Sequence, residues 1–145
     1  MNYFEARLSH ETDAADVAAE LGSAVYTLVD TRSEKAYDAG HLPGAISLKR
    51  DPLPDGPLVV YCWGPGCNAA TKAAARISAL GREVKEMIGG FEYYVREGYP
   101  VEGEQAERHG KDQSGLVVLP SGTMVGCSPP SERSSSSATP MAPAI

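Results

Sequence analysis

Several features that mark particular classes of protein are missing from this sequence of 145 residues. Its start, Met1 to Arg7, lacks the basic-then-apolar order of a signal peptide, and no apolar run approaches the roughly 20 residues that cross a bilayer. We therefore expect a cytoplasmic protein without a membrane partner. Lysine and arginine number 13 against 19 aspartate and glutamate, which gives a net charge of -6. The composition of such an acidic chain does not indicate a basic surface, so nucleic acid is not an expected partner either.

Cysteine is also scarce. The three cysteines are Cys62, Cys67 and Cys127, an odd number that does not suit a framework of disulfides. In a reducing compartment such cysteines are catalytic, redox-active or simply buried. Cys127 stands in polar sequence without a nearby histidine or cysteine, so we expect no zinc site built from the three thiols. The chemistry is therefore to be sought at Cys62 and Cys67.

The C-terminal part of the chain has few apolar residues. From residue 128 onward serine and proline dominate, and such a segment cannot bury enough apolar surface to offset its ordering entropy. We predict disorder over residues 128–145. Residues 103–127 are polar apart from Leu116–Leu119, a patch that could dock on the rest of the chain. The change in composition predicts a domain over residues 1–102 and a C-terminal extension over residues 103–145.

Before residue 103, the apolar pattern alternates between strand and helix periodicity. The predicted strands cover residues 4–8 (a short edge strand), 25–30, 45–48, 58–61 and 83–88. The predicted helices cover residues 12–21, 33–39, 68–80 and 91–97. Strands that alternate with helices predict an α/β fold, with a mostly parallel central sheet and helices on both faces.

The most informative segment joins the buried strand 58–61 to the helix that opens at Asn68, a good cap residue. The strand delivers Cys62 at its carboxyl end, where open α/β sheets place their ligands. Gly64 and Gly66 let the loop curl with its amide hydrogens inward, and the positive end of the helix adds to their field. Such a cradle favours the Cys62 thiolate and would also hold an anionic persulfide. The alternative is an ordinary buried cysteine beside a tight turn. The expected anion-binding loop consists of Trp63, Gly64, Pro65, Gly66, Cys67 and Asn68.

Three ordered stretches of the sequence resemble the signatures of the rhodanese homology domain. Residues 28–45 contain Asp-Thr-Arg at a strand end, followed by Gly-His-Leu-Pro-Gly-Ala. Residues 60–68 read Val-Tyr-Cys-Trp-Gly-Pro-Gly-Cys-Asn, and residues 87–101 carry Gly-Gly ahead of an aromatic-rich segment. The resemblance covers most of residues 4–101, and it implies a rhodanese-like fold for the domain.

The resemblance implies a sulfurtransferase of the thiosulfate sulfurtransferase type, with Cys62 as the catalytic residue. Its thiolate would attack the outer sulfur of thiosulfate or a persulfide, and a thiol or cyanide would then discharge the Cys62 persulfide. Neither a cofactor nor a metal is implied. Asp30 and Arg32 match the first signature and would order neighbouring loops or form a structural ion pair. His41 falls in a turn, where a structural role is favoured over that of a general base.

The loop departs from the family's common pattern, Cys-x-x-Gly-x-Arg-Ser, because Cys67 and Asn68 occupy the positions of arginine and serine. No cationic side chain stands between Cys62 and Lys72, so donor recognition would depend on backbone dipoles. This favours a small persulfide or a protein persulfide partner over thiosulfate. Phosphatases of this fold carry an arginine where Asn68 stands, which argues against phosphatase chemistry.

Other functions remain open beside the enzyme. The domain could be a sulfur-relay or regulatory module that presents Cys62 to a protein partner, or a thiol-redox switch. In a switch, Cys67 would resolve an oxidised or persulfidated Cys62 by forming a disulfide, although a role as a small residue packed at the helix start is slightly favoured. Trp63 could flank an organic acceptor or simply pack. Cys127 could take sulfur from Cys62 as a thiol in the tail.

Overall fold

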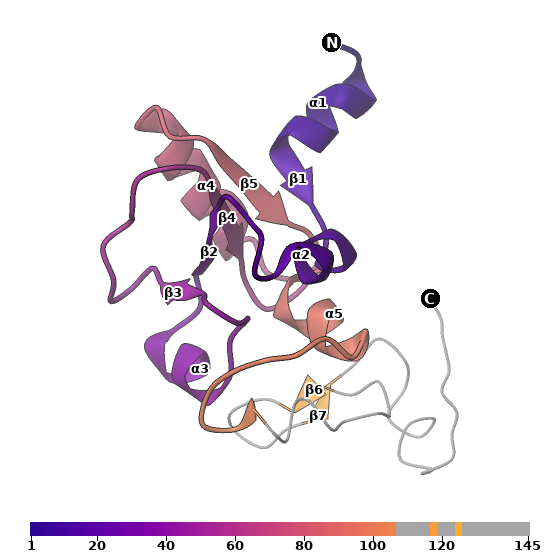
Figure 1. Ribbon diagram of the computed structural model, residues 1–145, viewed down its shortest axis with the longest axis vertical. Helices are drawn as coiled ribbons and strands as arrows, with labels where there is room; N and C mark the ends of the chain where they lie inside the picture. The colour runs from indigo at the N-terminus through magenta and orange to yellow at the C-terminus, as the bar shows by residue number, and fades with distance from the viewer. Residues whose placement is uncertain (107–116, 119–123, 126–145) are drawn as a thin grey trace.

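A five-stranded parallel sheet forms the centre of the protein. The computed structural model describes residues 1–106, 117–118 and 124–125. The strand order is β1-β5-β4-β2-β3, and every neighbouring pair is parallel (Figure 1). The strands are β1 (Glu11–Thr12), β2 (Thr27–Asp30), β3 (Ile46–Ser47), β4 (Leu58–Tyr61) and β5 (Val84–Met87). The predicted α/β class with a parallel sheet is confirmed.

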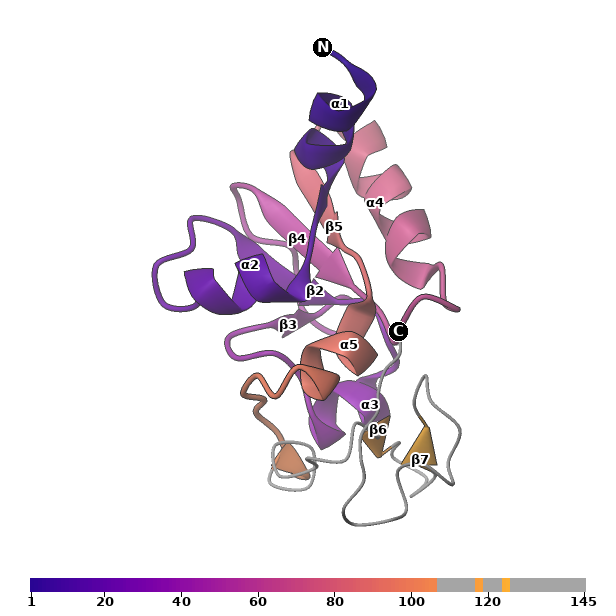
Figure 2. The same ribbon diagram turned by 90° about the vertical axis from the view of Figure 1, so that its right-hand side faces the viewer.

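Helices cover both faces of this sheet. They are α1 (Tyr3–His10), α2 (Ala14–Glu20), α3 (Glu34–Ala39), α4 (Ala69–Ala79) and α5 (Gly90–Arg96). Figure 2 shows α4 on one face, with α2 and α5 on the other. Since consecutive parallel strands need a crossover, the helices between them fall naturally on the two faces. The described helices include none that is both long and apolar enough to cross a membrane.

The central strand β4 is buried on both faces, and this burial positions the segment that follows it. Val59 and Tyr61 belong to the apolar cluster that includes residues of α2 and α5, whereas Leu58 and Val60 belong to the cluster that includes residues of α4. This alternation is the two-residue period of a strand with a helix layer on either side. The strand therefore ends in the interior, and Cys62 is the next residue.

The predicted edge strand over residues 4–8 is wrong, because this segment is part of helix α1. The Asn2 side chain accepts a hydrogen bond from the Glu5 amide at 2.8 Å, and the Glu5 carboxylate accepts one from the Asn2 amide at 3.0 Å. This capping box starts a helix whose residues are all outside the core. The edge strand is instead β1, which pairs with β5. The other predicted elements are present, with ends shifted by at most two residues.

The described chain beyond residue 101 continues along α3. Glu102 forms an antiparallel bridge with His41, and the amide of Gln105 donates to the carbonyl of Ala39. Within the patch Leu116–Leu119, strand β6 (Val117–Val118) pairs with β7 (Met124–Val125). The predicted disorder over residues 128–145 and the position of Cys127 lie outside the described residues. The domain boundary at residue 102 stays a prediction.

Candidate active site at the end of strand β4

Cys62 occupies the carboxyl end of β4 and is 3% exposed. The backbone amides of Gly64 and Ala70 lie near its sulfur and lower the pKa of the thiol. The thiol in turn donates to the carbonyl oxygen of Cys67 at 3.0 Å. Gly64 belongs to the loop and Ala70 to the first turn of α4, so loop and helix both contribute to the cradle that the sequence predicts.

The start of α4 is capped in an unexpected way. Asn68 occupies the N-cap position that the sequence predicts, although its side chain makes no capping hydrogen bond. Instead, the amide of Ala69 donates to the sulfur of Cys67, as that of Ala70 does to the sulfur of Cys62. The two cysteine sulfurs thus take the free amides that a cap residue would normally satisfy.

The two thiols have opposite pKa shifts. Burial raises the pKa of Cys62 to about 11, the amides of Ala70 and Gly64 lower it, and the nearby Cys67 raises it again. Burial also opposes ionisation of Cys67, but the pKa of this thiol is lowered because hydrogen bonds from the Ala69 amide and the Cys62 thiol outweigh that effect. The expectation that the loop favours the Cys62 thiolate is therefore not met at neutral pH. The loss of hydration destabilises the buried Cys62 thiolate more than the two nearby amides stabilise it.

Helix α5 holds the loop from its other side. The amide of Phe91 donates to the carbonyl of Cys62 at 2.8 Å, and the amide of Glu92 donates to that of Trp63 at 2.7 Å. Gly90 makes this approach possible, with a φ of +65° and no side chain. A Cβ at Gly90 would lie 2.7 Å from both the Cys62 oxygen and the Gly64 nitrogen. Residue-level reasoning missed Gly90, although the Gly-Gly pair in the sequence is a signal for it.

Replacing Gly90 with alanine is expected to destabilise the domain by roughly 2–5 kcal/mol, from about 1–2 for the left-handed backbone and about 1–3 for overlap with the loop. Urea unfolding of the variant measures this loss. The matched control is Gly98→Ala, because Gly98 also has a positive φ (+88°) but has open space around it. Equal losses in the two variants would show that the contact between α5 and the loop contributes nothing.

Asp30 and Arg32 form a buried ion pair at the carboxyl end of β2. The Arg32 Nη2 lies 2.6 Å from the Asp30 Oδ2, and both side chains are at most 1% exposed. The Tyr61 hydroxyl donates to the same Asp30 carboxylate at 2.9 Å and accepts a bond from the Leu42 amide at 3.1 Å. The pair and Tyr61 therefore join the ends of β2 and β4 directly below the loop.

Arg32 also supports the loop through its aromatic neighbours. Its guanidinium carbon lies 4.1 Å from the ring centroid of Phe91 and 4.4 Å from that of Trp63. Trp63 meets Phe91 edge to face, with centroids 5.8 Å apart. The structure thus gives Trp63 packing contacts, and Asp30 neutralises the charge that Arg32 brings near Cys62.

His41 lies in the turn after α3. Its Nδ1 is 2.7 Å from the carbonyl oxygen of Tyr37, and because a carbonyl only accepts, this nitrogen carries the proton. The ring stacks on that of Tyr37 with centroids 3.9 Å apart, and Nε2 faces the Glu102 carboxylate at 3.8 Å. These contacts suit the structural role expected for His41, which stays a prediction.

A hollow of about 510 Å³ borders the loop on the side of Pro65. Tyr93 and Ile88 supply apolar surface to it, while Asp13 and Glu97 supply carboxylates. Among the residues that the structure describes, neither a lysine nor an arginine lines this space. It therefore suits a neutral or cationic molecule better than a dianion.

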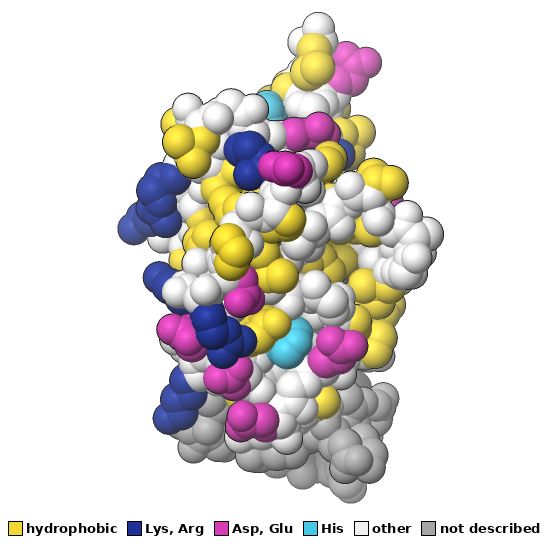
Figure 3. Space-filling view, turned by 60° about the vertical axis from the view of Figure 1, so that its left-hand side comes forward, with side chains coloured by type: hydrophobic (Ala, Val, Ile, Leu, Met, Phe, Trp, Pro, Cys, Tyr) yellow, Lys and Arg dark blue, Asp and Glu magenta, His cyan; other side chains and the backbone are white. Residues whose placement is uncertain are grey.

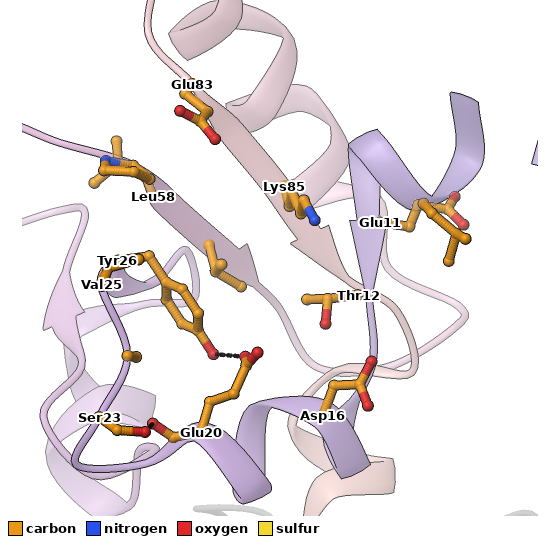
Figure 4. A pocket seen from close by; sticks show the side chains of 14 residues that line it. Glu11, Thr12, Asp16, Glu20, Ser23, Val25, Tyr26, Leu58, Glu83 and Lys85 are labelled. Atoms are coloured by element: carbon orange, nitrogen blue, oxygen red, sulfur yellow. Dashed lines mark hydrogen bonds between the residues drawn. The ribbon is translucent and has the colours of Figure 1, made fainter. Parts of the chain in front are cut away.

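A second hollow, of about 520 Å³, lies at the amino ends of the strands, opposite the Cys62 loop. Figure 4 shows Tyr26 hydrogen-bonded to Glu20, with Leu58, Glu83 and Lys85 across from them. The described residues that line it include neither a cysteine nor a histidine, so nucleophilic chemistry is favoured at the loop instead.

The distribution of side chains on the surface, and the grouping of those that could ligate a metal, are relevant to partners and cofactors. On the face in Figure 3, acidic and basic side chains are interspersed and hydrophobic ones gather between them. Within the described part of the chain, no three His, Cys, Asp or Glu side chains are grouped as a metal site would require.

Comparison with known proteins defines the class. The rhodanese-like domain family matches residues 13–97, and the chain belongs to this family. The chain is 36% identical over 92 residues to the HTH-type transcriptional regulator Rv0324 of Mycobacterium tuberculosis, covering 58% of this chain and 41% of the regulator. The chain thus spans well under half the length of this curated relative.

Two solved structures extend the comparison. The BH2092 protein of Bacillus halodurans has 40% identity and a TM-score of 0.67, with 73% of this chain and 85% of that one covered. The rhodanese-like domain of the Anabaena protein Alr3790 has 25% identity and a TM-score of 0.56, with 68% and 82% covered. The rhodanese-like fold implied by the sequence motifs is confirmed.

Proposed function

We propose that this domain is a sulfurtransferase in which Cys62 accepts a sulfane sulfur and passes it to an acceptor thiol. The observation that carries the proposal is the cradle around the Cys62 sulfur, made by the amides of Gly64 and Ala70. A persulfide places its charge on the outer sulfur, which extends beyond the buried Cys62 toward the same loop and helix start. The site thus suits the charged intermediate of a two-step transfer, and no step needs a cofactor.

A persulfide is the donor that the surroundings favour. Arg32, which packs against Trp63 of the loop, is neutralised by Asp30, and the described lining of the hollow beside Pro65 has carboxylates but no lysine or arginine. A dianion such as thiosulfate would have to approach against this field, whereas a persulfide on a neutral or cationic carrier would not. We also propose a cytoplasmic location, because Cys62 and Cys67 are both free thiols.

A second candidate is a regulatory role. The similarity to a curated HTH-type transcriptional regulator favours it, because the matched part there belongs to a longer protein. In that role the domain would carry sulfur on Cys62 and report its presence to a partner, with little turnover of small molecules. The chemistry at Cys62 would be the same, and only the fate of the persulfide would differ.

Intact mass tests the proposal. The wild type, incubated with a glutathione persulfide and desalted, is expected to gain sulfur, to transfer it to added thiol or to release it as hydrosulfide, while Cys62→Ser does none of these. A retained adduct would add about 32 Da, and cyanide would remove it. Failure of the wild type with glutathione persulfide and with thiosulfate would contradict the proposal. An adduct without turnover to small thiols would favour the regulatory role.

A further inference from the structure

Cys67 shares the site of Cys62 rather than lying beside it by chance. The Cys62 thiol donates a hydrogen bond to the Cys67 carbonyl at 3.0 Å, and the two side chains are near enough that each shifts the pKa of the other. The turn that brings them together is closed by the Cys67 amide, which donates to the Gly64 carbonyl at 3.0 Å. Cys62 is buried, whereas Cys67 is partly exposed. The second thiol of the loop is therefore the more accessible of the two.

We propose that Cys67 resolves the Cys62 persulfide inside the domain, so that the bound sulfur leaves as hydrosulfide and a Cys62–Cys67 disulfide remains. This inference rests on the proposed sulfurtransferase function, since the persulfide must form first. It adds a reductive activity to the site: the domain would both accept a sulfane sulfur and reduce it with its own two thiols.

The step balances in atoms and electrons. The Cys67 thiolate attacks the inner sulfur of the protonated Cys62 persulfide, and a bond forms between the two cysteine sulfurs. The bond between the inner and outer sulfurs breaks, and the outer sulfur leaves with its proton and the electron pair as HS⁻. The sulfane sulfur is reduced by two electrons and the two cysteines are oxidised to the disulfide. An external dithiol then reduces the disulfide and restores both thiols.

The electrostatics of the pair favour this direction of attack. The pKa of Cys67 is lowered and that of Cys62 is raised, so Cys67 ionises more readily and is the better internal nucleophile of the two. Attack on the outer sulfur would expel the Cys62 thiolate, a poor leaving group because burial raises its pKa to about 11. Attack on the inner sulfur expels hydrosulfide, the conjugate base of a stronger acid.

The experiment follows sulfur and disulfide together in a Cys127→Ser background, which removes the third thiol. Reduced, desalted protein receives one equivalent of glutathione persulfide without other thiol. Hydrosulfide is measured with a fluorescent probe, and a tryptic digest under acid is analysed for a Cys62–Cys67 link. We expect close to one hydrosulfide and one disulfide per chain, with little retained sulfur adduct.

The matched variant is Cys67→Ser, which is expected to accumulate the Cys62 persulfide as a lasting mass gain while hydrosulfide falls at least tenfold. A stable adduct on the wild type, without a disulfide, would overturn the inference and leave the sulfurtransferase standing. Absence of sulfur uptake, disulfide and hydrosulfide in both proteins would instead overturn the proposed function. If Cys67→Ser does not fold, the peptide link in the wild type decides the matter alone.

Discussion

Sulfur uptake by Cys62 is expected to accelerate about tenfold for each unit of pH between about pH 7 and pH 10. Burial raises the pKa of Cys62 to about 11, so roughly one thiol in ten thousand is ionised at pH 7. The reactive thiolate is the minor form throughout this range, and its fraction grows as the proton concentration falls. Single-turnover transfer from thiosulfate, whose charge is constant over this range, measures the rate by quenched intact mass.

Cys67→Ser tests the cause of this pH dependence. Cys67 raises the pKa of Cys62 through its hydrogen bond and its charge, but burial is the largest cause and remains in the variant. The plateau of the rate is therefore expected to move to lower pH and still to stay above the range of an ordinary thiol. A wild-type rate that is flat from pH 7 to pH 9 would show instead that the amides of Gly64 and Ala70 dominate over burial.

The position of the candidate nucleophile could be predicted from the sequence, because it depends on local patterns. The apolar run 58–61 has the length of a buried strand, and β4 covers the same residues. The glycines after Cys62 predicted a tight loop before a helix, and α4 begins at Ala69. The motifs that resemble the rhodanese family added the fold, which the family match confirms.

Helix α1 shows where apolar periodicity fails. Phe4 and Leu8 are 70% exposed, so their spacing reflects no burial and gave no reliable strand or helix signal. The pair Asn2 and Glu5 carried the decisive information, since together they form the capping box. Attention to the cap would have predicted the helix.

The protonation of the two cysteines could not be predicted, because it depends on long-range burial and on which amide meets which sulfur. Sequence alone shows that glycines and a helix start surround Cys62, and this favours a thiolate. It does not show that the sulfur is almost fully enclosed, nor that Ala69 turns its amide to Cys67. Likewise, Gly90 contacts the loop across 28 positions of the chain, a closeness that only the fold creates.

Asp30→Ala is expected to destabilise the domain by about 3–5 kcal/mol, because it leaves a buried charge without its partner. The Arg32 side chain is 1% exposed and would lose the carboxylate that now lies 2.6 Å from its Nη2. The Tyr61 hydroxyl would lose its acceptor in the same step. Urea unfolding measures the loss, and sulfur uptake is expected to fall with it, since Arg32 packs under Trp63.

Two further variants test whether the loss of stability in Asp30→Ala comes from the burial of the ion pair or simply from the removal of a charge. Asp38→Ala removes one of the carboxylates around Arg50, at 3.2 Å in an exposed pair, and little change in stability is expected there because solvent screens both charges. Replacing Asp30 and Arg32 together by leucine and methionine removes both buried charges, so this double variant should be more stable than Asp30→Ala. If Asp30→Ala unfolds at the same urea concentration as Asp38→Ala, the buried pair does not hold the ends of β2 and β4 together. The network under the Cys62 loop would then rest on packing of Phe91 and Trp63 instead.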